Sequence, residues 1–71
     1  MRLGRFMSAE PVGTAPRETY IVRSSSGDAL GVVEWYPRWG QYIFDPASGV
    51  ALSHECLSAL AAFCKQPMGE P

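Results

Sequence analysis

Three short strand-like stretches, each followed by a turn signal, succeed one another in the middle of this 71-residue chain. They are rich in β-branched and aromatic residues, which favour strands, and the segments between them contain Gly27, Pro37, Gly40 and Gly49, which favour turns. Tight reversals of this kind join antiparallel strands. We therefore expect strands at 19–23, 29–36 and 41–45, with turns at 24–28, 37–40 and 46–49.

A helix is expected after residue 52. Ser53 suits the N-cap, Glu55 the first turn and Lys65 the last turn, and Leu52 with Leu57 matches a hydrophobic staple. Pro67 is expected to stop the helix. The residues expected to form its apolar stripe are Cys56, Leu57, Leu60, Ala61 and Cys64.

These elements predict an α+β fold, in which a three-stranded antiparallel sheet carries one C-terminal helix on one face. Residues 50–52 could add a short fourth strand at the edge. Residues 1–17 contain Gly4, Pro11, Gly13 and Pro16 without a sustained period, so we expect a flexible arm. The folded β-β-β-α domain is expected at 18–65, followed by a disordered tail at 66–71.

Aromatic residues gather between positions 35 and 44, which hold Trp35, Tyr36, Trp39, Tyr42 and Phe44. In a chain this small, large aromatic side chains can supply most of the core. Glu34 must face water, so the strand alternation turns Val33 and Trp35 toward the helix, and we expect Tyr42 and Phe44 there too. The opposite face, with Leu30, Val32, Ile21 and Ile43, is left uncovered and is a candidate interaction surface.

The charge distribution argues against a protein that binds the phosphate backbone of a nucleic acid. The predicted domain carries Arg23, Arg38 and Lys65 against five carboxylates, and nucleic-acid binding wants a basic stripe. The two cysteines, Cys56 and Cys64, lie about 12 Å apart along one helix, which is too far for a disulfide. Reduced thiols and the lack of a long apolar run predict an intracellular, cytoplasmic protein without a membrane segment.

No catalytic or metal site is expected. Ser53, His54 and Glu55 are adjacent, but consecutive helical residues point about 100° apart and do not assemble a triad. His54, Cys56 and Cys64 are the soft metal ligands, and the two thiols are too distant to share an ion. We predict a protein that is not an enzyme and has no cofactor.

Recognition is assigned to the turn and the uncovered face. The candidate partner-binding residues are Tyr36, Arg38, Trp39, Leu30 and Val32, since Trp, Tyr and Arg are enriched in binding hot spots. Two alternatives remain open: stacking of single-stranded nucleic acid on the aromatic residues, and burial of the uncovered face in a homodimer that serves a structural or regulatory role.

The segments 30–46 and 56–64 resemble a group of small proteins encoded by bacteriophages and prophages. The shared pattern is L-G-x-(V/I)-x-W-Y-x-x-W, then Y-x-F-x-P, then C-L with a following A-x-F. The residues that carry it are Leu30, Gly31, Val33, Trp35, Tyr36, Trp39, Tyr42, Phe44, Pro46, Cys56, Leu57, Ala61 and Phe63. Gly40, where that group often has a basic residue, and Leu60, in place of isoleucine, depart from the pattern.

The resemblance implies a context more than an activity, because most members of that group have no assigned function. Small phage accessory proteins often block a host machine by binding it, and anti-CRISPR proteins are of this size. The resemblance thus implies a non-catalytic inhibitor that binds a host protein, such as a CRISPR effector subunit, in the cytoplasm of a bacterial host.

Overall fold

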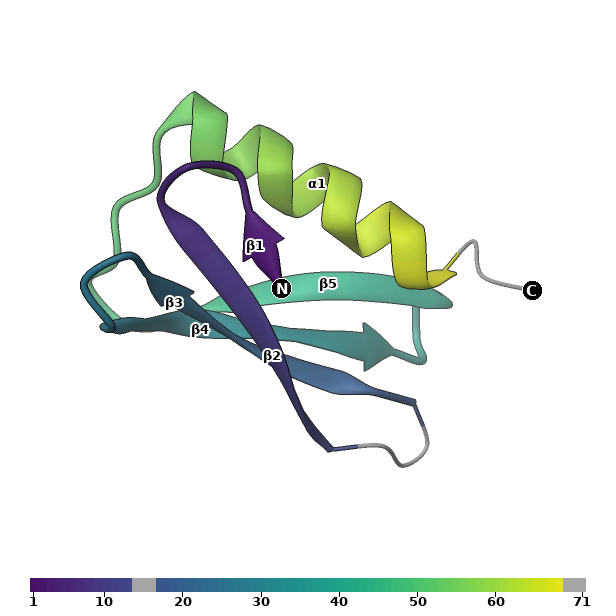
Figure 1. Ribbon diagram of the computed structural model, residues 1–71. Helices are drawn as coiled ribbons and strands as arrows, with labels where there is room; N and C mark the ends of the chain where they lie inside the picture. Colours follow the sequence, from purple (N-terminus) through teal and green to yellow (C-terminus); the bar gives the residue numbers. More distant parts are fainter. Residues whose placement is uncertain (14–16, 69–71) are drawn as a thin grey trace.

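The structure is a computed structural model that describes residues 1–13 and 17–68, the last three of these by their backbone alone. Its strands form one antiparallel sheet in the order β1-β2-β3-β4-β5, and a helix follows the last strand (Figure 1). The elements are β1 (Arg2–Leu3), β2 (Met7–Gly13), β3 (Thr19–Ser24), β4 (Ala29–Tyr36), β5 (Gln41–Pro46) and α1 (His54–Met68). The α+β class is confirmed.

The sheet has five strands, so the prediction of three or four strands is wrong. Both additional strands come from the segment expected to be a flexible arm, and residues 50–52 form no strand. The reason lies in three small or flexible apolar residues that reach the core: Leu3 is 6% exposed, Met7 4% and Ala9 1%. The expected arm is therefore part of the fold over residues 2–13, while residues 14–16 lie outside the described residues.

Backbone hydrogen bonds close the N-terminal hairpin and join it to the rest of the sheet. The Met1 ammonium donates to the carbonyl oxygen of Ala9 at 2.8 Å, and the Ala9 N–H donates back to the Met1 carbonyl at 2.7 Å. At the other end, the Ser25 N–H donates to the carbonyl oxygen of Phe6 at 2.8 Å. β2 pairs with β3 from Met7↔Ser24 to Gly13↔Thr19, so this hairpin continues the sheet.

The helix lies over the sheet and contacts the first and last strands, β1 and β5 (Figure 1). The sheet curves so that these two strands both lie beneath α1. The buried core fills the space between them: Leu3, Met7, Ala9, Val22, Val33, Tyr42, Leu60 and Phe63. The inward direction predicted for Val33 and Tyr42 is confirmed, and Trp35 and Phe44 pack against this cluster.

The buried stripe of α1 differs from the one expected. Leu60 and Phe63 are 3% exposed, whereas Leu57 is 53% exposed, and Phe63 meets Tyr20 edge-to-face at a centroid distance of 4.9 Å. The expected stripe lacks Phe63, which is as buried as Leu60 and belongs to the core cluster. The stripe comprises Cys56, Ala59, Leu60, Phe63 and Cys64.

The two ends of α1 compare differently with their predictions. The Cys56 N–H donates to the Ser53 hydroxyl at 3.3 Å, which confirms the N-cap. The helix includes Pro67 and extends to Met68, so the prediction that Pro67 stops it is wrong. Of the expected tail, residues 69–71 lie outside the described residues.

A β-bulge between β3 and β4 brings Gly31 close to β5. The pairing changes register between Val22↔Gly31 and Arg23↔Ala29. A Cβ added at Gly31 would meet the carbonyl oxygen of Asp45, and would lie 2.8 Å from both Cζ of Phe44 and Cα of Pro46. Only glycine fits this position without displacing the β5 backbone.

Leu3→Ala tests whether the N-terminal segment is structural. We expect the free energy of unfolding to fall by about 2–5 kcal/mol, because the substitution leaves a cavity beneath α1. Val12→Ala is the matched control, since Val12 lies in β2 and is 60% exposed. Chemical denaturation measures both, and equal small effects would contradict the role given to β1.

Gly31→Ala tests the close approach of β4 and β5. We expect a loss of about 1–3 kcal/mol or more in the free energy of unfolding, because the β5 backbone must shift. Gly13→Ala is the control, since its added Cβ would have Thr19 at an ordinary 3.9 Å. A thermal melt of Gly31→Ala that matches Gly13→Ala would refute this packing.

Candidate functional site

The face of the sheet opposite α1 carries three apolar side chains from the three C-terminal strands. Ile21 is directly opposite Val32 in the ladder, and Ile43 is opposite Glu34, one pair further along. All three are half-buried, and none packs against the core cluster. We call Ile21, Val32 and Ile43 the apolar row; within the described residues no helix covers it.

Charged side chains surround the apolar row. Glu10 lies opposite Ile21, Asp45 opposite Val32 and Glu34 opposite Ile43. Glu10 is paired with Arg23 at 3.1 Å, and Arg23 also donates to the Gly27 carbonyl oxygen at 3.3 Å. Within the described part of the chain, Glu34 and Asp45 have no ion pair.

The β4–β5 turn places an aromatic pair at one end of this face. The rings of Tyr36 and Trp39 meet edge-to-face at 4.8 Å, and Trp39 is 66% exposed. The turn is closed by backbone hydrogen bonds from Trp39 and Gly40 to the Tyr36 carbonyl oxygen, at 3.2 and 2.9 Å. Arg38 is exposed in the same turn. Strand alternation puts Tyr36 on the face of Val32 and Glu34, so the aromatic pair continues the apolar row.

Four of the five predicted recognition residues fall on one surface, and Leu30 does not. Tyr36, Arg38, Trp39 and Val32 lie on or beside the open face, whereas Leu30 packs against the core cluster. The β-bulge explains the different direction of Leu30. Its neighbours Ala29 and Gly31 both have partners on β3, whereas Leu30 has none, so the alternation of side chains is interrupted there. The placement of Leu30 on the open face was therefore wrong.

The other aromatic residues of the 35–44 cluster belong to the covered side. Trp35 and Tyr42 meet edge-to-face at 5.6 Å, and the Tyr42 hydroxyl donates to the Glu18 carbonyl oxygen at 3.0 Å. The Arg17 guanidinium lies 4.0 Å from the Trp35 ring centroid, a cation–π contact between residues far apart in the sequence that no local pattern indicates. The cluster thus divides between core and surface.

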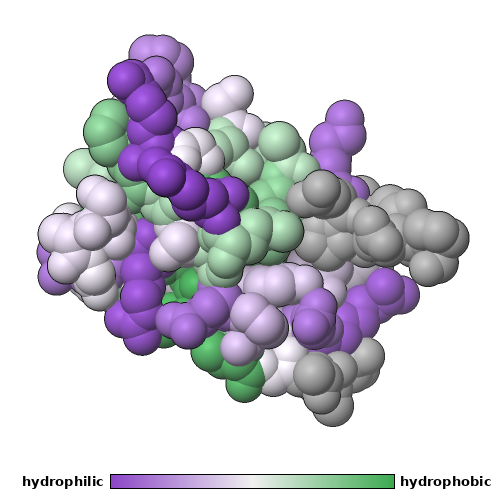
Figure 2. Space-filling model, viewed as in Figure 1, coloured by the Kyte–Doolittle hydropathy of each residue, from purple (hydrophilic) through white to green (hydrophobic). Residues whose placement is uncertain are grey.

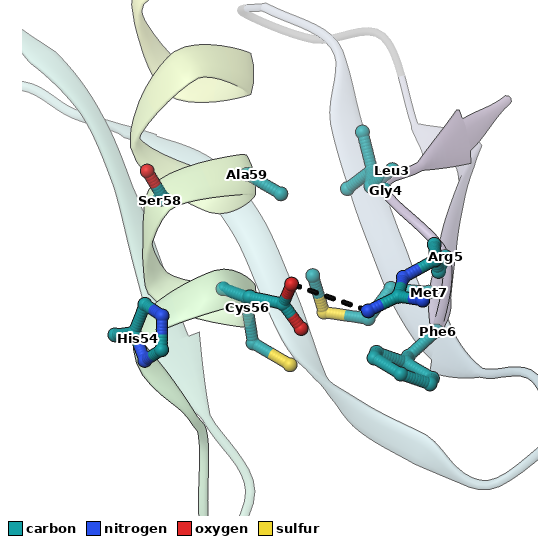
Figure 3. A pocket seen from close by; sticks show the side chains of 10 residues that line it. Leu3, Gly4, Arg5, Phe6, Met7, His54, Cys56, Ser58 and Ala59 are labelled. Carbon is teal, nitrogen blue, oxygen red and sulfur yellow. Dashed lines mark hydrogen bonds and ion pairs between the residues drawn. The ribbon is translucent and has the colours of Figure 1, made fainter.

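A groove of about 290 Å³ runs between the β1–β2 turn and the first turns of α1 (Figure 3). Arg5 and Glu55 form an ion pair across it at 3.3 Å, and both are largely exposed. Figure 3 shows the His54 ring and the Cys56 thiol pointing in different directions. No hydrogen bond joins the side chains of His54, Cys56 and Ser58 among the described residues of this groove.

Among residues 1–13 and 17–68, no three His, Cys, Asp or Glu side chains cluster as metal ligands would. In the same part of the chain, no helix is both long and apolar enough to cross a membrane. Figure 2 shows apolar surface broken up by polar side chains, with strongly apolar atoms at the lower edge away from the helix.

The chain matches no protein-family model, no curated protein and no solved structure. The likeness to small phage proteins stays a prediction from the sequence pattern.

Burial raises the pKa of the Cys64 thiol above its ordinary value of 9.0. At a given pH the folded protein therefore holds less Cys64 thiolate than the unfolded chain, and alkylation with iodoacetamide should be slower in the fold. The neutral Cys64 thiol stabilises the fold at pH values below 9. This contribution to the free energy of unfolding is lost as the pH rises through the raised pKa. Mass spectrometry of the peptide that contains Cys64, with a urea-unfolded control, measures the rate; equal rates would contradict the burial.

Proposed function

We propose that the protein is a non-catalytic module that binds another protein through its open face. The docking surface consists of the apolar row with Glu34, Asp45, Tyr36, Arg38 and Trp39. One observation carries the proposal: Trp39, at 66% exposure, is held against Tyr36 at the end of an apolar row that no described element covers. Apolar side chains gathered on a face that no described element covers are typical of interaction sites.

The chemistry of the docking surface suits a protein partner. Trp, Tyr and Arg are the residue types most enriched in hot spots, and here all three come from one short turn. The turn hydrogen bonds and the edge-to-face contact hold the Tyr36 and Trp39 rings in place before binding. A preorganised aromatic pair loses less side-chain entropy when a partner is bound.

Nucleic acid is the second candidate, because Trp39 and Arg38 could stack on a base. The carboxylates of Glu34 and Asp45 lie on the same face and would repel a phosphate backbone. We therefore favour a protein partner. The phage-protein resemblance adds the expectation that this partner is a bacterial protein, such as a subunit of a CRISPR effector, and that binding inhibits it.

The double variant Arg38→Ala/Trp39→Ala tests the proposal. We expect it to lose a partner that the unaltered protein retains in affinity capture from bacterial lysate, because it removes the hot-spot side chains. Its free energy of unfolding should fall by no more than about 1.5 kcal/mol, since both residues are exposed and the Tyr36–Trp39 ring contact is worth about 0.5–1.5 kcal/mol.

Leu57→Ala is the matched control, because Leu57 is a 53% exposed apolar residue on α1, away from the docking surface. It should retain the partner. If the double variant unfolds, Trp39 is structural; if it captures the same partner as the unaltered protein, the docking surface is wrongly placed.

Titration with fluorescent single-stranded oligonucleotides at low salt separates the two candidates. We expect no salt-sensitive binding, because the docking surface is acidic. Binding that weakens steeply with added salt and disappears in Arg38→Ala/Trp39→Ala would replace the protein-binding proposal with the nucleic-acid one.

A further inference from the structure

We infer that the segment of the partner that occupies the docking surface alternates apolar side chains with lysine or arginine. This inference rests on the proposed function and adds the chemistry of the partner. Its basis is the position of unpaired carboxylates among the apolar side chains of the open face.

The ladder register sets the pattern. One row across the sheet reads Glu10, Ile21, Val32 and Asp45, so a carboxylate lies at each end of an apolar pair. The next row places Glu34 beside Ile43. Directly opposite residues have Cβ atoms about 4.5–5.5 Å apart. A partner that covers Val32 and Ile43 therefore also covers Asp45 and Glu34.

Two carboxylates of this face, Glu34 and Asp45, are not neutralised by the cation on it. Arg23 is engaged by Glu10 at 3.1 Å and by the Gly27 carbonyl oxygen, so it is not available to the other carboxylates. Glu34 and Asp45 have no ion pair among the described residues. Covering an unpaired carboxylate with apolar atoms is strongly unfavourable, so the covering segment must bring its own cations.

Lysine and arginine satisfy both demands of the surface. Their aliphatic stems can lie along Ile21, Val32 and Ile43 while the charged ends reach the carboxylates. At the end of the face, the exposed ring of Trp39 can also accept a guanidinium in a cation–π contact. An acidic segment would be repelled by the two unpaired carboxylates and attracted by one cation of the turn, Arg38.

A second copy of this chain is a poorer occupant. In a face-to-face dimer, Glu34 and Asp45 of one copy would approach a face that carries the same two carboxylates. The cation next to the apolar row, Arg23, lies two residues from Ile21 along β3 and is already paired with Glu10. Like charges that meet across an interface are unfavourable, so the face suits a basic partner better than itself.

Selection from a library of displayed random peptides on the immobilised full-length protein tests the inference. We expect the enriched peptides to combine lysine or arginine with apolar residues and to be released by salt. Titration calorimetry with the most enriched peptide, made synthetically, then measures its dissociation constant for each variant.

Glu34→Gln/Asp45→Asn removes the two charges with little change in shape, and we expect it to weaken that peptide at least about tenfold. Asp28→Asn/Glu55→Gln is the matched control, because it removes two exposed carboxylates outside the docking surface. The control should bind like the unaltered protein.

Other outcomes overturn the inference in distinguishable ways. Enriched peptides that are acidic or neutral would refute the charge inference and leave the docking surface intact. The same holds for peptides whose dissociation constant is unchanged by Glu34→Gln/Asp45→Asn but rises in Arg38→Ala/Trp39→Ala. No enrichment, or peptides that bind all variants equally, would count against both. Light scattering that shows a dimer, disrupted by Val32→Asp, would assign the face to a second copy.

Discussion

The structure depends on one helix that joins the two ends of a curved sheet. α1 contacts β1 and β5, and Leu60 and Phe63 fill the space between them, where Val22 and Val33 are fully buried. With 71 residues and two free cysteines, no disulfide can replace this packing. The N-terminal hairpin is therefore a necessary part of the fold, since its residues Leu3 and Met7 complete the buried core.

One helix can cover one face, and this limit produces the candidate site. The large aromatic residues Trp35 and Tyr42 lie on the covered side, while the apolar row and the Tyr36–Trp39 pair lie outside it. The solvated face of an antiparallel sheet usually carries mostly polar side chains. Here apolar and acidic side chains lie beside each other across neighbouring strands, which is the observation behind the proposed basic partner.

Local signals in the sequence were sufficient for β3, β4, β5 and the start of α1, because strand alternation and the Ser53 cap are short-range. They were insufficient at the N-terminus, because the glycine and proline residues there interrupt the strand pattern. The burial of Leu3, Met7 and Ala9 depends on a helix that is distant in the sequence. The predicted recognition residues Tyr36, Arg38, Trp39 and Val32 lie together on or beside the open face. Leu30 was misplaced because a bulge cannot be read from alternation, and Glu10 was missed with its strand.

In this arrangement the sheet has one face sealed by α1 and one face open to solvent. A soluble gadolinium chelate, which broadens the NMR signals of accessible methyl groups, tests it directly on the full chain. The methyl signals of Ile21, Val32 and Ile43 should broaden, because these side chains are half-buried and reach solvent. The methyl signals of Val22 and Val33 should stay sharp, because both side chains are 0% exposed. Equal protection of all five residues would contradict the account, since the second face would then also be covered.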